Sequence, residues 1–126
     1  MCLYKKTIFP RISTHPIICY KILSKGRDGG LYTPCCGVKV KIGDTVESKL
    51  PAVLGIFSGV INGEGVHAYS TKKGAITNAF MDIGDEVYEC VIPPYTFYYE
   101  GGGEDTNTIA AGKIKIGKRV WQKYEY

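Results

Sequence analysis

Long apolar runs are missing from the sequence, and none approaches the roughly 20 residues that a membrane-spanning helix needs. Histidine is scarce, with two residues, and the five cysteines include no pair at the two-residue spacing typical of zinc sites. The histidine pair of zinc proteases, the serine elbow of hydrolases and a glycine loop that would cradle phosphate are also missing. We therefore predict no metal, no cofactor and no membrane partner.

The composition is that of an ordinary globular chain. Its 126 residues suit one domain, 1–126, with 44% hydrophobic and 22% charged residues. The formal net charge of +4 is small and the lysines are scattered, which favours solubility over a dedicated nucleic-acid surface. Weak nucleic-acid binding stays as an alternative, through two predicted lysine faces at Lys39, Lys41, Lys113 and Lys115. The odd number of cysteines and the lack of a secretory signal predict reduced thiols and a cytoplasmic location.

Sixteen glycines and six prolines interrupt the sequence at intervals that suit short strands. Alternating or β-branched runs predict strands at 17–23, 38–42, 45–50, 66–69, 86–92 and 113–116. We expect an extended N-terminal arm at 1–16 and a mobile glycine-rich loop at 101–108. Residues 51–62 fit either a loose helix or a buried loop, and both alternatives stay open.

One helix is predicted, over about 72–82, and Ser70 or Thr71 can cap its first turn. Its apolar stripe consists of Ala75, Ile76, Ala79, Phe80 and Ile83. Five to seven short strands with one short helix indicate an α+β domain built on a mainly antiparallel, curved sheet. We expect the helix to cover one face of this sheet and water to cover the other, lysine-bearing face.

Tyrosine is unusually frequent, with ten residues, and aromatic side chains concentrate just before the glycine-rich loop. Tyrosine combines apolar area with a polar tip, which suits contact surfaces, and exposed rings can stack on a ligand. The alternative is that some of these rings pack in the core. On the first interpretation the chain is a non-catalytic binding module for a protein partner or small ligand, with homo-oligomers left open. The candidate binding residues are Tyr95, Phe97, Tyr98, Tyr99 and Trp121.

His67 is the candidate general base for a competing hypothesis, in which the protein is an enzyme. It follows a glycine turn and shares a predicted strand with Tyr69. A general base needs a carboxylate partner, and Glu64 or Glu89 could supply it. A histidine whose ring bonds to backbone at a strand end would produce the same local pattern. The sequence leaves the choice between a functional and a structural His67 open.

The order of several short segments resembles a known family. These segments are Met1–Leu3, Ile18–Leu23, Gly65–Tyr69, Glu89–Pro93, Tyr98–Gly101 and Ala111–Ile116. They are similar to a family of short proteins encoded by gut anaerobes and their phages. That family has no established activity, so the resemblance implies a bacterial or phage accessory protein and carries over no catalytic residue.

The strand, proline and aromatic segment that begins at Glu89 is also similar to the last strands of ADP-ribosyltransferase-like folds. That likeness implies the enzyme alternative in a more specific form, with a nucleotide or NAD as substrate. The sequence departs from this fold because its acidic catalytic motif is not identifiable here. The departure puts the catalytic part of the likeness in doubt.

Overall fold

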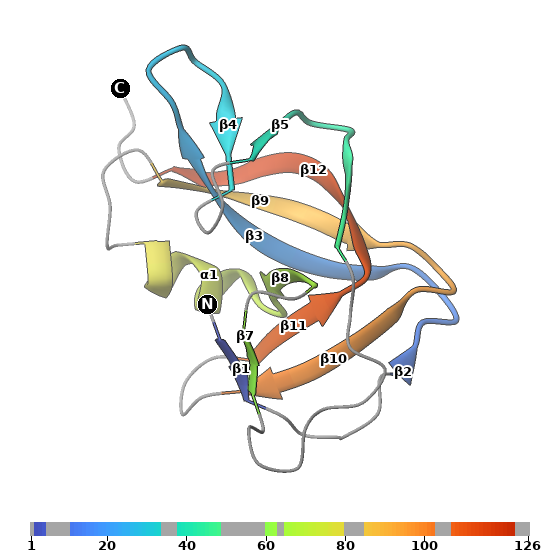
Figure 1. Ribbon diagram of the computed structural model, residues 1–126. Coiled ribbons are helices and arrows are strands. Elements are labelled where there is room, and N and C mark those ends of the chain that lie inside the picture. The colour runs from blue at the N-terminus through green and yellow to red at the C-terminus, as the bar shows by residue number, and fades with distance from the viewer. Residues whose placement is uncertain are drawn as a thin grey trace.

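Most of the described chain lies in one large antiparallel sheet (Figure 1). The computed structural model describes residues 2–4, 11–33, 38–48, 60–62, 65–79, 85–102 and 107–122. The sheet consists of β2 (Arg11–Ile12), β3 (Ile17–Lys25), β4 (Leu31–Tyr32), β5 (Lys39–Val40), β6 (Thr45–Glu47), β8 (Val66–Tyr69), β9 (Asp85–Ile92), β10 (Phe97–Gly102), β11 (Asn107–Ala111) and β12 (Lys113–Gln122). A second sheet pairs β1 (Cys2–Tyr4) with β7 (Val60–Asn62), and the helix α1 spans Lys72–Ala79. The predicted α+β, mainly antiparallel architecture is confirmed.

The strands follow one another across the sheet in the order β2, β10, β11, β8, β3, β9, β12 and β6, while β4 pairs with β3 and β5 with β4. The prediction of five to seven strands is wrong, because this sheet alone contains ten strands. Four of them, β2, β4, β5 and β6, have only two or three residues. β5 and β6 lie within the predicted strands at 38–42 and 45–50, whereas β2 and β4 are too short to leave a periodic pattern in the sequence. Pairing with β10 and β3 defines β2 and β4 instead.

β12 curves the sheet at Gly117. Its register against β9 shifts between Ile116 and Arg119, which marks a β-bulge. At this point the backbones come so close that a Cβ on Gly117 would lie 2.3 Å from the carbonyl oxygen of Glu89. Bulges increase the local twist of a strand, and β12 bends strongly where it runs down to β11 in Figure 1.

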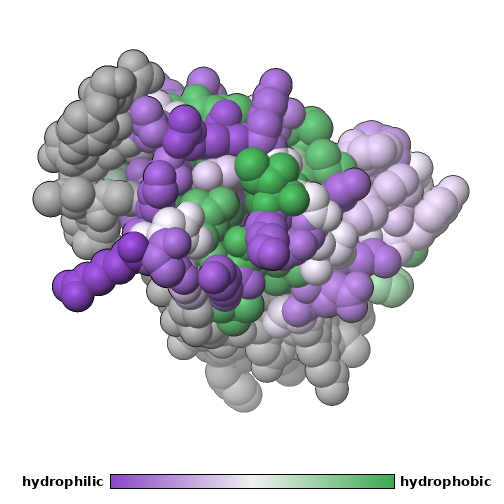
Figure 2. Space-filling model, turned by 90° about the horizontal axis from the view of Figure 1, so that it is seen from above, coloured by the Kyte–Doolittle hydropathy of each residue, from purple (hydrophilic) through white to green (hydrophobic). Residues whose placement is uncertain are grey.

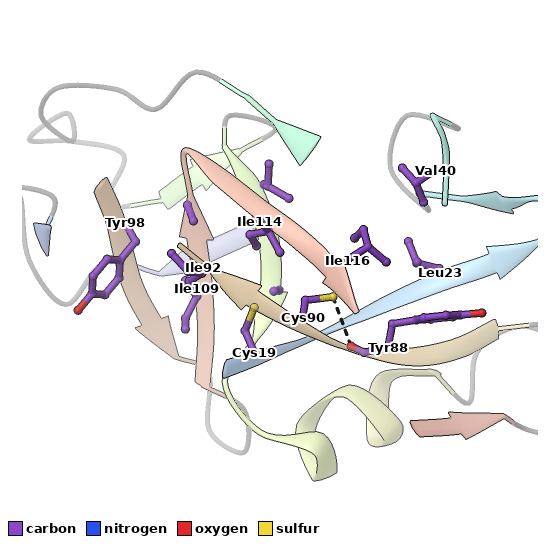
Figure 3. Close-up of a cluster of buried hydrophobic side chains, with 13 residues drawn as sticks. Cys19, Leu23, Val40, Tyr88, Cys90, Ile92, Tyr98, Ile109, Ile114 and Ile116 are labelled. Atoms are coloured by element: carbon purple, nitrogen blue, oxygen red, sulfur yellow. Dashed lines mark hydrogen bonds between the residues drawn. The ribbon is translucent and has the colours of Figure 1, made fainter. Parts of the chain in front are cut away.

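The main hydrophobic core lies on the face of the sheet away from α1 (Figure 3). Its buried members come from seven strands of the sheet and are Cys19, Leu23, Val40, Val66, Ala68, Tyr88, Cys90, Ile92, Tyr98, Ile109, Ala111, Ile114 and Ile116. A smaller cluster on the helix side joins Ala75 and Ala79 of α1 to Tyr69 and Val87. The sheet is therefore buried on both faces over much of its centre.

The expectation of one helix-covered face and one wet, lysine-bearing face is wrong. On β9, Val87 packs against the helix cluster, and Val91 lies on the same face because side chains alternate along a strand. Lys115 of β12 is directly opposite Val91 and is exposed. An exposed lysine position and the helix thus share one face, while the opposite face holds the core. Alternation shows which residues share a face, but it does not show what covers that face.

α1 begins as one of the two expected caps predicts. The side-chain oxygen of Thr71 accepts a 3.1 Å hydrogen bond from the N–H of Gly74, which satisfies a free donor of the first turn. The described helix ends at Ala79. Phe80 and Ile83 of the predicted stripe lie outside the described residues.

The extended arm expected at 1–16 and the mobile loop expected at 101–108 both contribute residues to strands. β1 and β2 fall within the 1–16 arm and pair with β7 and β10. Within 101–108, Gly101 and Gly102 pair with Thr108 and Asn107, and 103–106 lies outside the described residues. Within 51–62, the described residues form β7, whereas 51–59 lies outside them.

Candidate functional site

The aromatic residues proposed as one binding segment fall into two groups. Tyr98 is buried in the main core and Tyr99 is only 1% exposed, and burial raises the pKa of Tyr99. Trp121 is half-buried against the helix-side cluster. Tyr98 and Tyr99 thus pack inside the protein, and Trp121 leaves only part of its side chain at the surface. Tyr95 and Phe97, in contrast, are 77% and 55% exposed.

An exposed apolar group forms where β10 meets the edge strand β2. Phe97 is directly opposite Ile12 in the β10–β2 ladder, and Ile12 is 48% exposed. Directly opposite residues point to the same face of a sheet, so these two side chains lie together. Tyr95 precedes Phe97 by two residues, in the turn that leads into β10. We call Ile12, Tyr95 and Phe97 the Tyr95 surface.

Ser13, a residue that the sequence reasoning missed, fixes the turn that carries Tyr95. Its hydroxyl donates a 2.7 Å hydrogen bond to the carbonyl oxygen of Pro93 and accepts one of 2.9 Å from the N–H of Thr96. Its own N–H donates to the carbonyl oxygen of Thr96, and its carbonyl oxygen accepts from the N–H of Tyr95. Ser13 is buried. No local signal could have found it, because its partners lie near the other end of the chain.

The backbone of Tyr95 adopts a left-handed conformation, with φ at 60°. Among the residues that the structure describes, it is the only one other than glycine with a positive φ. An ordinary side chain in this region costs about 1–2 kcal/mol relative to a right-handed conformation. The hydrogen bond from its N–H to the carbonyl oxygen of Ser13, together with the bonds of Ser13 to Pro93 and Thr96, holds the strained residue in place.

Further exposed apolar residues occur beside the short strand β5, at Val38 and Ile42. Figure 2 shows the molecule from above, and on this face the coloured hydrophobic residues form small groups separated by hydrophilic ones. Scattered apolar residues are normal on protein surfaces. The Tyr95 surface differs from them because a strained backbone presents its central ring.

The described candidate catalytic residues, His67, Tyr69 and Glu89, are spread over two strands, β8 and β9, that are separated by β3. His67 and Tyr69 share one face of β8. Tyr20 of β3 lies between the other two strands: it is directly opposite Tyr69 of β8 on one side and directly opposite Glu89 of β9 on the other. Tyr69 and Glu89 are therefore two strand spacings apart, about 10 Å between their backbones. Burial raises the pKa of Tyr69. Glu64 lies outside the described residues.

His67 takes part in a backbone contact with a buried lysine. β3 and β8 are paired at Tyr20 and Tyr69, and the Nζ of Lys21 donates a 2.8 Å hydrogen bond to the carbonyl oxygen of His67. The lysine side chain thus bridges two strands beside the end of their ladder. This contact gives the His67 backbone a structural role, whatever its ring does.

A partly buried polar cluster that the sequence did not reveal joins β9 to β12, with Glu86 and Tyr88 buried and Arg119 exposed. One carboxylate oxygen of Glu86 accepts from Arg119 at 2.8 Å, and the other accepts from the hydroxyl of Tyr88 at 3.2 Å. Burial, followed by the charge and hydrogen bond of Glu86, raises the pKa of Tyr88 to about 12. Each oxygen of the Glu86 carboxylate thus already accepts a hydrogen bond. The arrangement is that of an ion pair that links two strands, rather than that of a general base.

Two of the lysines proposed for nucleic-acid binding have acidic neighbours. Lys39 pairs with Asp28 at 3.1 Å, and the same carboxylate accepts from Tyr32 at 2.7 Å. Hydrogen bonds from Tyr32, Gly30 and Lys39 lower the pKa of Asp28. On β12, Lys113 is directly opposite Glu47. Acidic neighbours therefore offset part of the positive charge that phosphate binding would use.

Within the part of the chain that the structure describes, no group of three histidine, cysteine or acidic residues is placed to hold a metal ion. No helix among the same residues is long and apolar enough to cross a membrane. No protein-family model matches the sequence, and neither a curated protein nor a solved structure gives a match. The resemblances in sequence to short phage-related proteins and to ADP-ribosyltransferase-like folds thus stay predictions.

Proposed function

We propose that this protein is a small non-catalytic binding module that holds a protein partner or a ligand against the Tyr95 surface. The observation that supports this function is the left-handed backbone of Tyr95 beneath a ring that is 77% exposed. The ring is mostly in water, so little packing offsets the backbone strain. Strained residues persist at sites where function requires a side chain in one position.

The neighbours of Tyr95 suit a contact surface. Phe97 and Ile12 add two exposed apolar side chains from adjacent strands. Tyrosine and phenylalanine are enriched at the centres of interfaces, where their area is buried without many lost rotamers. Arg11 and Glu100 form an exposed pair at 3.8 Å on the other face of the same two strands, because side chains alternate along a strand. A role as a bacterial or phage accessory protein would be consistent with such a module.

The test uses Tyr95→Gly, which removes the ring and suits the left-handed backbone, so that lost binding cannot result from unfolding. The matched control is Ile42→Ser, which removes an exposed apolar side chain elsewhere. Each variant is cross-linked in extract of the source cells, and captured molecules are identified by mass spectrometry. We expect the unaltered chain and Ile42→Ser to capture the same partner and Tyr95→Gly to lose it.

Equal capture by Tyr95→Gly and the unaltered chain would refute this function. Two further measurements identify the alternatives. A thermal shift with NAD or a nucleotide that disappears in His67→Ala would favour the enzyme. Nucleic-acid binding that weakens steeply with salt and is lost on replacing Lys113 and Lys115 would favour the third hypothesis.

A further inference from the structure

Two buried cysteines face each other across the centre of the sheet. Cys19 of β3 is directly opposite Cys90 of β9, within a ladder that continues regularly on both sides of this pair. Both are free thiols with no exposed surface, and both belong to the main core. Figure 3 draws the two side chains as neighbours, with Ile114 above them and Ile109 to one side. The Tyr95 surface does not include either thiol.

The register of the two strands fits a covalent bond between the sulfur atoms. Directly opposite residues of an antiparallel pair have Cα atoms about 4.5–5.5 Å apart. Disulfides span Cα distances of about 4.4–6.8 Å. We propose that Cys19 and Cys90 are an oxidative modification site, which a small disulfide of the glutathione class converts into a cross-strand disulfide within the native register.

The chemistry consists of two thiol–disulfide exchanges. The thiolate of one cysteine attacks a sulfur of oxidised glutathione, which forms a mixed disulfide and releases one reduced glutathione. The thiolate of the second cysteine then attacks the mixed disulfide at the protein sulfur, which closes the Cys19–Cys90 bond and releases a second reduced glutathione. The protein loses two electrons and two thiol protons, and one oxidised glutathione becomes two reduced molecules.

The environment of the pair makes the first exchange slow in the folded protein. Burial raises the pKa of both thiols, and the positive charge of Lys21 opposes this only in part. The thiolate is the reactive form, and a glutathione molecule cannot reach a sulfur that has no exposed surface. The first exchange therefore takes place while the β3–β9 pair is open, during folding or local unfolding. Once closed, the disulfide is protected by the same core.

The test measures whether the fold favours the bond. In a variant that retains only Cys19 and Cys90, with Cys2, Cys35 and Cys36 replaced by serine, the chain is refolded in buffers of graded reduced and oxidised glutathione. Linked peptides are quantified by mass spectrometry after acid quenching, in native buffer and in denaturing urea. At the midpoint of oxidation, half of the chains carry the Cys19–Cys90 bond. We expect this midpoint to lie at a glutathione ratio at least about tenfold more reducing in native buffer than in urea, because a disulfide and the fold that accommodates it stabilise each other.

Matched variants and a second readout keep the result decisive. Cys19→Ala and Cys90→Ala in the same background can form only mixed disulfides and should lose the linked peptide. The oxidised protein should also melt at a higher temperature than the reduced protein. An equal or less reducing midpoint in native buffer would overturn the proposal, because it would mean that the native register strains the bond. If the serine variant does not fold, the same peptide mapping on the unaltered chain decides whether Cys19–Cys90 is the dominant pair.

Discussion

The backbone N–H of Tyr95 donates a 2.7 Å hydrogen bond to the carbonyl oxygen of Ser13. This bond joins the turn between β9 and β10 to the residue that follows β2, so two distant parts of the chain determine one surface. The strained turn and the edge strand are thus a single unit. Changes to Ser13 should act on the stability of this unit, whereas changes to the Tyr95 ring should act on binding.

Replacing Ser13 by alanine should lower the free energy of unfolding by about 1–3 kcal/mol, because the buried Pro93 carbonyl and the Thr96 N–H both lose their side-chain partner. Urea denaturation measures the change. Thr14→Ala is the control, since this exposed neighbour bonds only to His15 among the described contacts. A cost for Ser13→Ala no larger than that for Thr14→Ala would show that the hydroxyl does not hold the turn.

Replacing Tyr95 by glycine should raise the free energy of unfolding by about 0.5–1 kcal/mol. The change removes about 1–2 kcal/mol of left-handed strain, and the greater freedom of glycine in the unfolded chain offsets part of the gain. Tyr95→Ala retains the strain and loses the ring, so it should be the less stable of the two variants. Thermal unfolding of both proteins under identical conditions makes the comparison. A less stable glycine variant would contradict the strain on which the proposed binding surface depends.

Local patterns in the sequence predicted the elements that have a clear period or cap. The alternating run at 113–116, the run at 17–23 and the helix that begins after Thr71 all occur in the structure. The two-residue strands β2 and β4 could not be predicted in the same way. β2 has two residues and exists because Phe97 and Tyr98 pair with it.

The candidate site was predictable in part. The sequence placed aromatic residues near 95–99 but could not divide them between core and surface. Which aromatic residues are buried depends on which face of β10 is covered by the rest of the protein. The exposure of Tyr95 depends in addition on the left-handed turn before β10. The carboxylate of Glu86 was equally hidden, because its partner Arg119 belongs to a strand whose register shifts at a bulge.

The hydroxyl of Tyr88 should make stability fall at alkaline pH. Burial and Glu86 raise its pKa from 10.0 to about 12, so the folded chain keeps a proton that the unfolded chain has lost. The stabilisation is complete below pH 10 and disappears as the pH rises through about 12. The urea midpoint of Tyr88→Phe should therefore decline less steeply over this range than that of the unaltered chain. Some decline should remain in the variant, because the pKa values of Tyr69 and Tyr99 are raised as well.

The control for this measurement is Tyr95→Phe, which removes a hydroxyl from an exposed ring. Urea midpoints of the three proteins are compared at several pH values from neutral to strongly alkaline. Identical slopes for Tyr88→Phe and the unaltered chain would mean that Tyr88 ionises alike in the folded and unfolded states. In that case the Glu86 cluster would not hold the phenolic proton.

The bulge at Gly117 should tolerate no side chain, although nothing in its backbone angles requires glycine. A methyl group there would lie 2.3 Å from the carbonyl oxygen of Glu89, and β12 would have to move away from β9 to admit it. We expect Gly117→Ala to lower the free energy of unfolding by about 1–3 kcal/mol. Gly112→Ala is the matched control, because its added methyl group would meet nothing closer than the Phe97 carbonyl oxygen at 3.7 Å. That variant should stay within about 0.5 kcal/mol of the unaltered chain. If both variants unfold at the same urea concentration, close approach of β9 and β12 does not determine the curvature of the sheet, and the bend of β12 needs another cause.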